Sequence, residues 1–178
     1  MEREILEGID SLQFFPPSYQ FMVYVRHHGF PSPLFDWTKS PYIALHFAYA
    51  DSLPDMDVAV YAYVSLPEGS KGGWASAPTI TEQGSYVTSH ARHFRQQAAY
   101  TVCAEGEARK LTYCSHEKVF QSGNERHDLL RKYILPSKLR VEVLRRLRLM
   151  NINTYSLFAS EEGLMHMLAV DEITLKDR

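Results

Sequence analysis

The sequence predicts an α+β fold in a single domain over residues 1–178. Its 178 residues are 45% hydrophobic and 22% charged, which fits one globular domain with a real core. Segments with helical and with extended patterns are mixed along the chain. They do not alternate regularly, so the sequence favours α+β over a doubly wound parallel sheet.

Composition excludes several classes of protein. The net charge is −2, so no overall positive field indicates nucleic-acid binding. No apolar run approaches the ~20 residues of a membrane-spanning helix, and the acidic N-terminus does not resemble a signal peptide. We therefore expect a soluble, cytoplasmic protein without a membrane partner. The two cysteines are too few for a disulfide framework or a four-cysteine zinc site, and we expect no bound metal.

The N-terminal third contains two predicted helices. The first covers residues 2–10, with apolar residues at helical spacing. The second covers residues 19–28, where Ser18 can cap the start and Gly29 can end the helix. Its expected inward face consists of Phe21, Met22 and Val25.

A short strand and another helix follow. Residues 34–37 predict a short buried strand after a proline-rich turn. Ser40 and Pro41 are a strong helix-start signal, because serine caps free amides and proline suits the first helical position. We expect this helix to reach Tyr49. Its expected inward face consists of Ile43, Ala44, Phe47 and Ala48.

The middle of the chain predicts strands. Residues 58–66 are rich in β-branched and aromatic side chains, and residues 69–90 predict a long loop. Further strands are expected at residues 98–103, around Val119 and at residues 131–135.

Two helices complete the prediction. Ser137 is expected to cap a helix that ends near Leu149, and Ser160 to open a last helix. Four arginines lie in the first of these helices: Arg140, Arg145, Arg146 and Arg148. They are more typical of a solvated helix face than of a nucleic-acid site.

The segment from His27 to Phe47 carries the most specific signal in the sequence. It resembles the core signature of the FRG domain family, in which a helix end is followed by an Asp-Trp-Thr-x-Ser-Pro step into another helix. Thirteen positions match: His27, Gly29, Pro31, Leu34, Asp36, Trp37, Thr38, Ser40, Pro41, Ala44, Leu45, Phe47 and Ala48. Three positions differ from the usual residue: Arg26, Ser32 and Phe35.

The likeness extends along nearly the whole chain. Residues 92–101 are similar to a family strand with two glutamines, and residues 133–169 to the family's C-terminal part. The Phe-Arg-Gly tripeptide that names the family is absent from the sequence. We therefore expect an FRG-like domain whose first strand is missing or is encoded upstream of Met1.

The resemblance implies a fold like that of ADP-ribosyltransferases, in which NAD binds to a split or curved mixed β-sheet flanked by helices. By this analogy Gln96 and Asp36 would be the catalytic residues. The residues that would hold NAD are His27, Trp37, Thr38, Ser40 and Arg92.

Most of these residues also have a simpler interpretation. Thr38 and Ser40 precede a helix N-terminus that suits a pyrophosphate, but Ser40 can be only an N-cap. Asp36 can orient His27 or His28, accept from a ribose hydroxyl, or bind turn amides. The Trp37 ring can stack on a nicotinamide or pack in the core. Gln96 can hold a ribose hydroxyl but cannot be a general base.

Two functions follow as hypotheses. In the first, the domain transfers ADP-ribose from NAD to a macromolecular acceptor, or cleaves NAD, in a bacterial toxin or an anti-phage effector with an antitoxin-like protein partner. NAD would then be the substrate and no metal would take part. In the second, the domain is a non-enzymatic module that binds a nucleotide or a partner.

Overall fold

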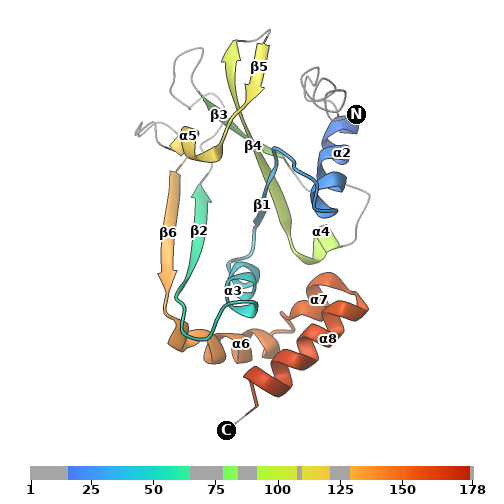
Figure 1. The fold of residues 1–178 in the computed structure, drawn as a ribbon, viewed down its shortest axis with the longest axis vertical. Coiled ribbons are helices and arrows are strands. Elements are labelled where there is room, and N and C mark those ends of the chain that lie inside the picture. The colour runs from blue at the N-terminus through green and yellow to red at the C-terminus, as the bar shows by residue number, and fades with distance from the viewer. Residues whose placement is uncertain (1–15, 65–77, 84–91, 108–109, 121–128, 177–178) are drawn as a thin grey trace. The chain divides into compact units, whose positions relative to one another are not determined.

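A computed structural model describes residues 16–64, 78–83, 92–107, 110–120 and 129–176, and it confirms the α+β class (Figure 1). The helix expected at residues 2–10 lies outside the described residues, as does most of the expected loop at 69–90. The chain forms two compact units. Unit 1 comprises residues 1–37, 64–90 and 99–129, and unit 2 comprises residues 38–63, 91–98 and 130–178.

A four-stranded sheet organises unit 1. Strand β4 (Ala98–Glu107) lies between β1 (Phe35–Thr38) and β3 (Thr79–Gln83). Strand β5 (Lys110–Tyr113) pairs with the second half of β4. The β3–β4 and β4–β5 pairings are antiparallel, and Ile80 stands opposite Cys103.

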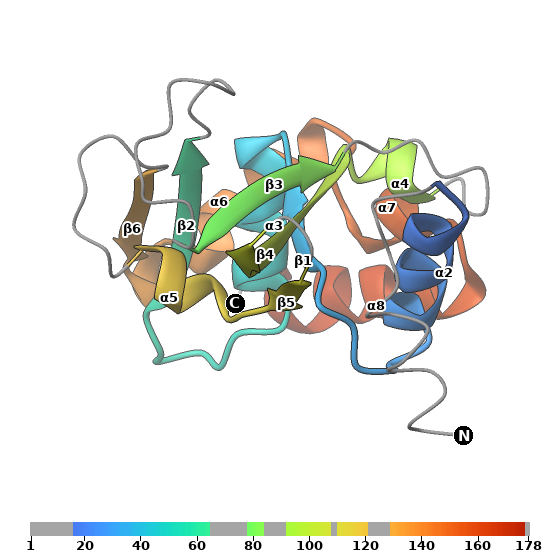
Figure 2. The same cartoon turned by 90° about the horizontal axis from the view of Figure 1, so that it is seen from above.

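Strand β4 is buried on both faces. Every side chain from residue 98 to residue 104 is buried, and Tyr100 and Thr101 are each only 1% exposed. Successive residues of a strand point to opposite faces, so the two side chains need different covers. Tyr100 contacts helix α2 (Pro16–His27) and Thr101 contacts helix α5 (His116–Phe120). Figure 2 shows these two helices on opposite sides of β4.

Helix α2 confirms the expected stop but not the expected inward face. Gly29 has φ +77°, the left-handed conformation that glycine adopts without strain. The helix begins at Pro16, earlier than predicted. It buries Met22 and Val23, whereas Phe21 is 49% exposed, so the prediction of Phe21 in the core is wrong. The buried face of α2 is shifted by about one residue along the helix relative to the predicted face.

Three further expectations in unit 1 need correction. Strand β1 exists, but Phe35 is 47% exposed because β1 ends the sheet among the described strands. Only Leu34, just before the strand, is fully buried. Val119 is buried in helix α5 and not in a strand. Strand β3 falls within the predicted loop, where the polar run Thr79–Gln83 conceals it.

Helix α3 (Pro41–Ala50) in unit 2 starts as predicted. The Ser40 hydroxyl accepts a hydrogen bond from the backbone N–H of Ile43 at 3.4 Å. The buried face differs from the predicted one: Phe47 is 42% exposed, whereas His46 is only 5% exposed. Helix α3 packs against α6 (Arg140–Leu149), and its contact stripe also includes Tyr49 and Ala50.

The rest of unit 2 is a two-stranded sheet and a group of short helices. Strand β2 (Val58–Val64) pairs with β6 (Leu129–Leu135), close to the predicted bounds. The helical elements, in addition to α3 and α6, are α4 (Arg92–Arg95), η1 (Ser137–Leu139), α7 (Thr154–Phe158), α8 (Glu161–Ala169) and η2 (Val170–Thr174). Ser160 caps α8 as predicted. Ser137 makes no side-chain cap, because a 3-10 turn precedes α6.

The arginines of α6 are more than a solvated face. Arg140 donates through Nε to the carbonyl oxygen of Tyr49 at 2.9 Å and through a terminal nitrogen to that of Ala50 at 3.1 Å. These carbonyls lie at the C-terminal end of helix α3, where that of Tyr49 also accepts from the Ser52 hydroxyl at 3.0 Å. Arg148 forms an ion pair with Asp171 at 3.0 Å. The arginines thus join α6 to its neighbours.

Within the part of the chain that the structure describes, no helix is long and apolar enough to cross a membrane.

Replacing Arg140 by alanine should lower the free energy of unfolding by about 2 kcal/mol, because two part-buried carbonyls lose a charged donor. Urea denaturation followed by circular dichroism measures this loss. Arg146→Ala is the matched control on the same helix: its side chain is 71% exposed and forms an exposed ion pair with Glu142, so its effect should stay below about 0.5 kcal/mol. Equal losses in the two variants would contradict the role of Arg140.

Candidate functional site

The predicted site residues fall into both units. His27, Asp36 and Trp37 belong to unit 1, whereas the others belong to unit 2. The unit 2 members are Thr38, Ser40, Arg92 and Gln96. Within unit 1, Asp36 and Trp37 are successive residues of β1 and therefore point to opposite faces of the sheet.

On the α5 side of the sheet, three rings form a contact group that we call the ring cluster: Phe35, Trp37 and His116. The Phe35 ring centroid lies 5.3 Å from that of Trp37 and 5.1 Å from that of His116. The Trp37 indole donates from Nε1 to the Thr101 hydroxyl at 2.8 Å. The same hydroxyl lies 2.8 Å from His116 Nε2. Two of the three rings are thus tied to one buried residue of β4.

The Thr101 hydroxyl accepts from the Trp37 indole, because Nε1 can only donate. With its hydrogen and its second lone pair the hydroxyl can either donate to His116 Nε2 or accept from it. Burial lowers the pKa of His116, which keeps the ring neutral near pH 7. The ring cluster is therefore an uncharged surface, and Phe35 is its exposed member.

The α2 side of the sheet is polar. Arg26 donates from Nε to the Asp36 carboxylate at 3.1 Å, and both side chains are partly exposed. The His27 ring lies 3.0 Å from the Tyr100 hydroxyl through Nε2. Burial, together with the charge of Asp36, raises the pKa of Tyr19 above its usual value. Among the described residues, Asp36 thus pairs with Arg26 and not with a histidine or a turn amide.

In unit 2 the predicted residues contact their own chain. The Thr38 hydroxyl donates to the carbonyl oxygen of Gln96 at 2.7 Å and accepts from the backbone N–H of Ser40 at 3.2 Å. The Gln96 amide donates to the carbonyl oxygen of Leu157 at 3.3 Å. A short helix joins Gln96 to Arg92, whose carbonyl accepts from the Gln96 N–H at 2.8 Å. The structure thus brings these residues close together, and the hydrogen bonds described above tie them to other parts of the same unit.

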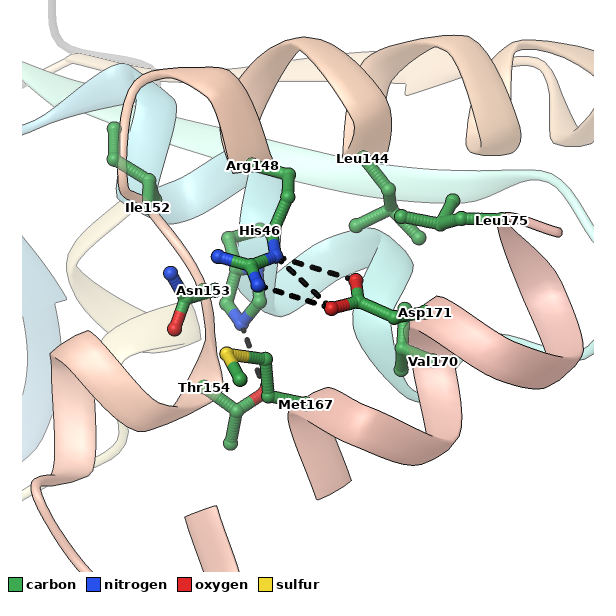
Figure 3. Close-up of a pocket in the computed structure, with 10 residues that line it drawn as sticks. All are labelled: His46, Leu144, Arg148, Ile152, Asn153, Thr154, Met167, Val170, Asp171 and Leu175. Atoms are coloured by element: carbon green, nitrogen blue, oxygen red, sulfur yellow. Dashed lines mark hydrogen bonds and ion pairs between the residues drawn. The ribbon is translucent and has the colours of Figure 1, made fainter. Parts of the chain in front are cut away.

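A cavity in unit 2 was not anticipated from the sequence (Figure 3). It has a volume of about 20 Å³, which is room for a water molecule or a small group. Its polar lining includes His46, Thr154 and the Arg148–Asp171 ion pair, and its apolar lining includes Leu144.

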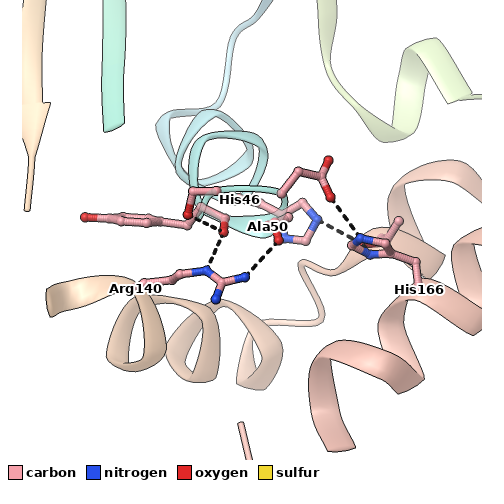
Figure 4. Close-up of polar contacts among 8 residues, drawn as sticks. His46, Ala50, Arg140 and His166 are labelled. Carbon is pink, nitrogen blue, oxygen red and sulfur yellow. Dashed lines mark hydrogen bonds and ion pairs between the residues drawn. The ribbon is translucent and has the colours of Figure 1, made fainter. Parts of the chain in front are cut away.

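Four side chains beside this cavity form a continuous series of hydrogen bonds. Asp51 lies 2.9 Å from His166 Nε2, and His166 Nδ1 lies 3.0 Å from the Thr154 hydroxyl. The same hydroxyl lies 3.3 Å from His46 Nε2. In Figure 4, the His46 ring points toward His166 on one side of α3, and Arg140 contacts another side of the same helix. The residues are far apart in sequence, so no local motif marks them. We call this series the histidine chain.

His46 is held neutral by its surroundings. Burial, followed by the neighbouring His166, lowers the pKa of His46 to about 4. Its Nδ1 atom is buried and has no hydrogen-bond partner among the described residues. Those residues contain no group of three or more histidine, cysteine, aspartate and glutamate side chains that could hold a metal ion.

Comparison with known families supports the resemblance inferred from the sequence. A family model, that of the FRG domain, matches residues 9–56. This range includes the whole signature from His27 to Ala48 and confirms the resemblance there. No curated protein and no solved structure matches the chain. The similarities at residues 92–101 and 133–169 lie outside the match and remain predictions.

The low pKa of His46 predicts a specific loss of stability in acid. The folded state binds this proton with a pKa of about 4, whereas an unfolded histidine binds it near 6.5, so falling pH favours the unfolded state. The contribution is complete above pH ~6.5 and lost as pH falls to ~4, up to about 3 kcal/mol. Urea denaturation across this range measures it. His46→Gln should show a shallower pH dependence than the wild type; identical slopes would contradict the assignment.

Proposed function

We propose that this FRG-like chain binds NAD and transfers or hydrolyses its ADP-ribose group, with an aromatic ring of NAD on the ring cluster of unit 1. The observation that carries the proposal is the exposure of Phe35, which is 47% exposed while it contacts two further rings. Flat apolar surfaces of this kind suit a nicotinamide or adenine ring, because offset stacking adds to the burial of the ring.

The ring cluster is arranged in advance of binding. Trp37 and His116 are both hydrogen-bonded to Thr101, a residue that is 1% exposed. A ligand ring that stacks on Phe35 therefore meets neighbours with fixed orientations, and little conformational entropy is lost on binding. The neutral His116 adds no charge that would repel a nicotinamide cation.

The position of β1 supports a route from the rings to a carboxylate. Because β1 ends the sheet among the described strands, a dinucleotide laid across this strand can reach both of its faces. Asp36 stands on the face opposite Trp37. Its ion pair with Arg26 is partly exposed and therefore weak, so a ribose hydroxyl can compete for the carboxylate.

Asp36 is the catalytic residue of this proposal. Breaking the bond between nicotinamide and ribose leaves positive charge on the ribose, and a nearby carboxylate stabilises that charge as it develops. The acceptor is then water or a nucleophile on a macromolecule. His27 supports this face by fixing the Tyr100 hydroxyl.

A non-enzymatic binding module is the second candidate, and one observation favours it. Thr38, Ser40 and Gln96 donate or accept hydrogen bonds within their own chain, which is what a structural role requires. A module of this kind can bind a nucleotide on the ring cluster without reacting with it. Activity measurements separate the two candidates.

Calorimetric titration with NAD tests the binding surface. We expect saturable binding in the micromolar range, near −8 kcal/mol. Phe35→Ala should weaken it up to about tenfold, because a stacked aromatic pair contributes about 0.5–1.5 kcal/mol. Tyr24→Ala is the matched control: Tyr24 is 49% exposed and its ring lies 4.4 Å from that of His28, but it is outside the ring cluster. Absence of heat, or equal effects of the two variants, would sink the proposed surface.

Release of nicotinamide, measured by chromatography, tests the reaction. If the chain cleaves NAD, Asp36→Asn should lower the rate about 100-fold or more while NAD binding changes little. Asp55→Asn, an equal loss of charge at an exposed position, should leave the rate unchanged. NAD binding without nicotinamide release in the wild type would favour the binding module.

A further inference from the structure

We infer that unit 2 holds a second reactive site, in which the Thr154 hydroxyl is a nucleophile toward a small neutral acyl ester and His166 is its base. This site is distinct from the proposed NAD surface and does not depend on it. It rests on the histidine chain and on the cavity beside it.

The hydrogen bonds of the histidine chain allow one order of protons when His166 is neutral. The Asp51 carboxylate can only accept, so His166 carries its proton on Nε2 and donates it to Asp51. His166 Nδ1 then accepts from the Thr154 hydroxyl at 3.0 Å. A hydroxyl bonded to a base, with that base oriented by a carboxylate, is the arrangement that activates a nucleophile.

His46 completes the arrangement from the other side. Once the Thr154 hydrogen is given to His166, the Thr154 oxygen is left to accept from His46 Nε2–H at 3.3 Å. Since burial lowers the pKa of His46, this ring stays a neutral donor and does not compete for the proton. A donor at this position orients the Thr154 oxygen and makes its hydroxyl easier to deprotonate.

The backbone holds Thr154 in place. Thr154 is the first residue of α7, and Asn153 caps that helix with a reciprocal pair of bonds to Ser156. Gly163 of α8 lies against it: a Cβ on Gly163 would stand 3.2 Å from the Thr154 carbonyl oxygen. The glycine thus permits the close approach that brings His166 to Thr154.

The cavity indicates the class of substrate. Thr154 lines it together with apolar side chains such as Leu144 and Met167 (Figure 3). Arg148 and Asp171 also line it, but their ion pair cancels their charges. A space of about 20 Å³ with both polar and apolar walls and no net charge has room for one small group, such as the methyl of a neutral acetyl ester.

The reaction is an acyl transfer. The Thr154 oxygen forms a bond to the carbonyl carbon, and the bond from that carbon to the leaving alcohol oxygen breaks. The Thr154 proton passes to His166 Nδ1 and then to the leaving oxygen, so an acyl-threonine and an alcohol result. Water attacks the acyl-threonine in the same way, which releases the acid and restores the hydroxyl.

Incubation of the full chain with p-nitrophenyl acetate tests the inference. The expected result is release of p-nitrophenolate together with an acetyl group on Thr154, located by peptide mass spectrometry. Thr154→Val, which keeps the shape of the side chain, should abolish both signals, and Thr154→Ser should retain them. Acetylation confined to lysines or histidines, or wild-type rates in Thr154→Val, would overturn the inference.

Two surface variants keep the test decisive should Thr154→Val fail to fold. Asp51 is a positioning residue with an exposed side chain, so Asp51→Asn should fold and slow acetylation of Thr154 about tenfold, less than for a buried triad carboxylate. Asp55→Asn, the matched loss of charge, should not slow it. Equal rates for the two variants would overturn the arrangement of hydroxyl, base and orienting carboxylate on which the inference rests, whatever the result with NAD.

Discussion

The burial of strand β4 on both faces is the constraint on which unit 1 depends. Because every residue from 98 to 104 is buried, each face of the strand needs its own cover. Side chains also alternate between the two faces in β1, so Asp36 and Trp37 lie on opposite faces of the sheet although they are neighbours in sequence. The chemistry of unit 1 is divided in the same way, with charged and phenolic groups on one face and flat rings on the other.

Unit 2 is held together differently, through polar groups around helix α3. Arg140 satisfies the carbonyls at the end of the helix, and His46 on another side of it is buried against the Thr154 hydroxyl. A buried imidazole needs a hydrogen bond to at least one ring nitrogen, because burial of a polar group without a partner lowers the stability of the fold. The histidine chain supplies such bonds at Nε2 but none at Nδ1.

Local features of the fold, such as helix ends, could be predicted from the sequence, whereas the contacts between distant elements could not. The cap at Ser40 and the stop at Gly29 depend on residues within one helical turn, and both are confirmed. The inward faces of the helices depend on distant elements. Hydrophobicity alone places Phe47 inside and His46 outside, but Thr154, more than a hundred residues away, reverses that order. The same holds for the candidate site. The signature residues could be recognised in the sequence, but the residues to which they are hydrogen-bonded could not.

The Asp36–Pro41 segment shows why a specific motif need not be a site in itself. Four polar side chains in it already have a structural bond: Asp36 to Arg26, Trp37 to Thr101, Thr38 to Gln96, and Ser40 to the amide of Ile43. A ligand has to displace one of these bonds, at a cost that rises with burial, or use surface that they leave open. Displacement is easiest at Asp36, whose ion pair is partly exposed, and open surface is greatest at Phe35. Binding chemistry is therefore expected at Asp36 and at the neighbouring Phe35, and the less exposed side chains of the segment hold those two in position.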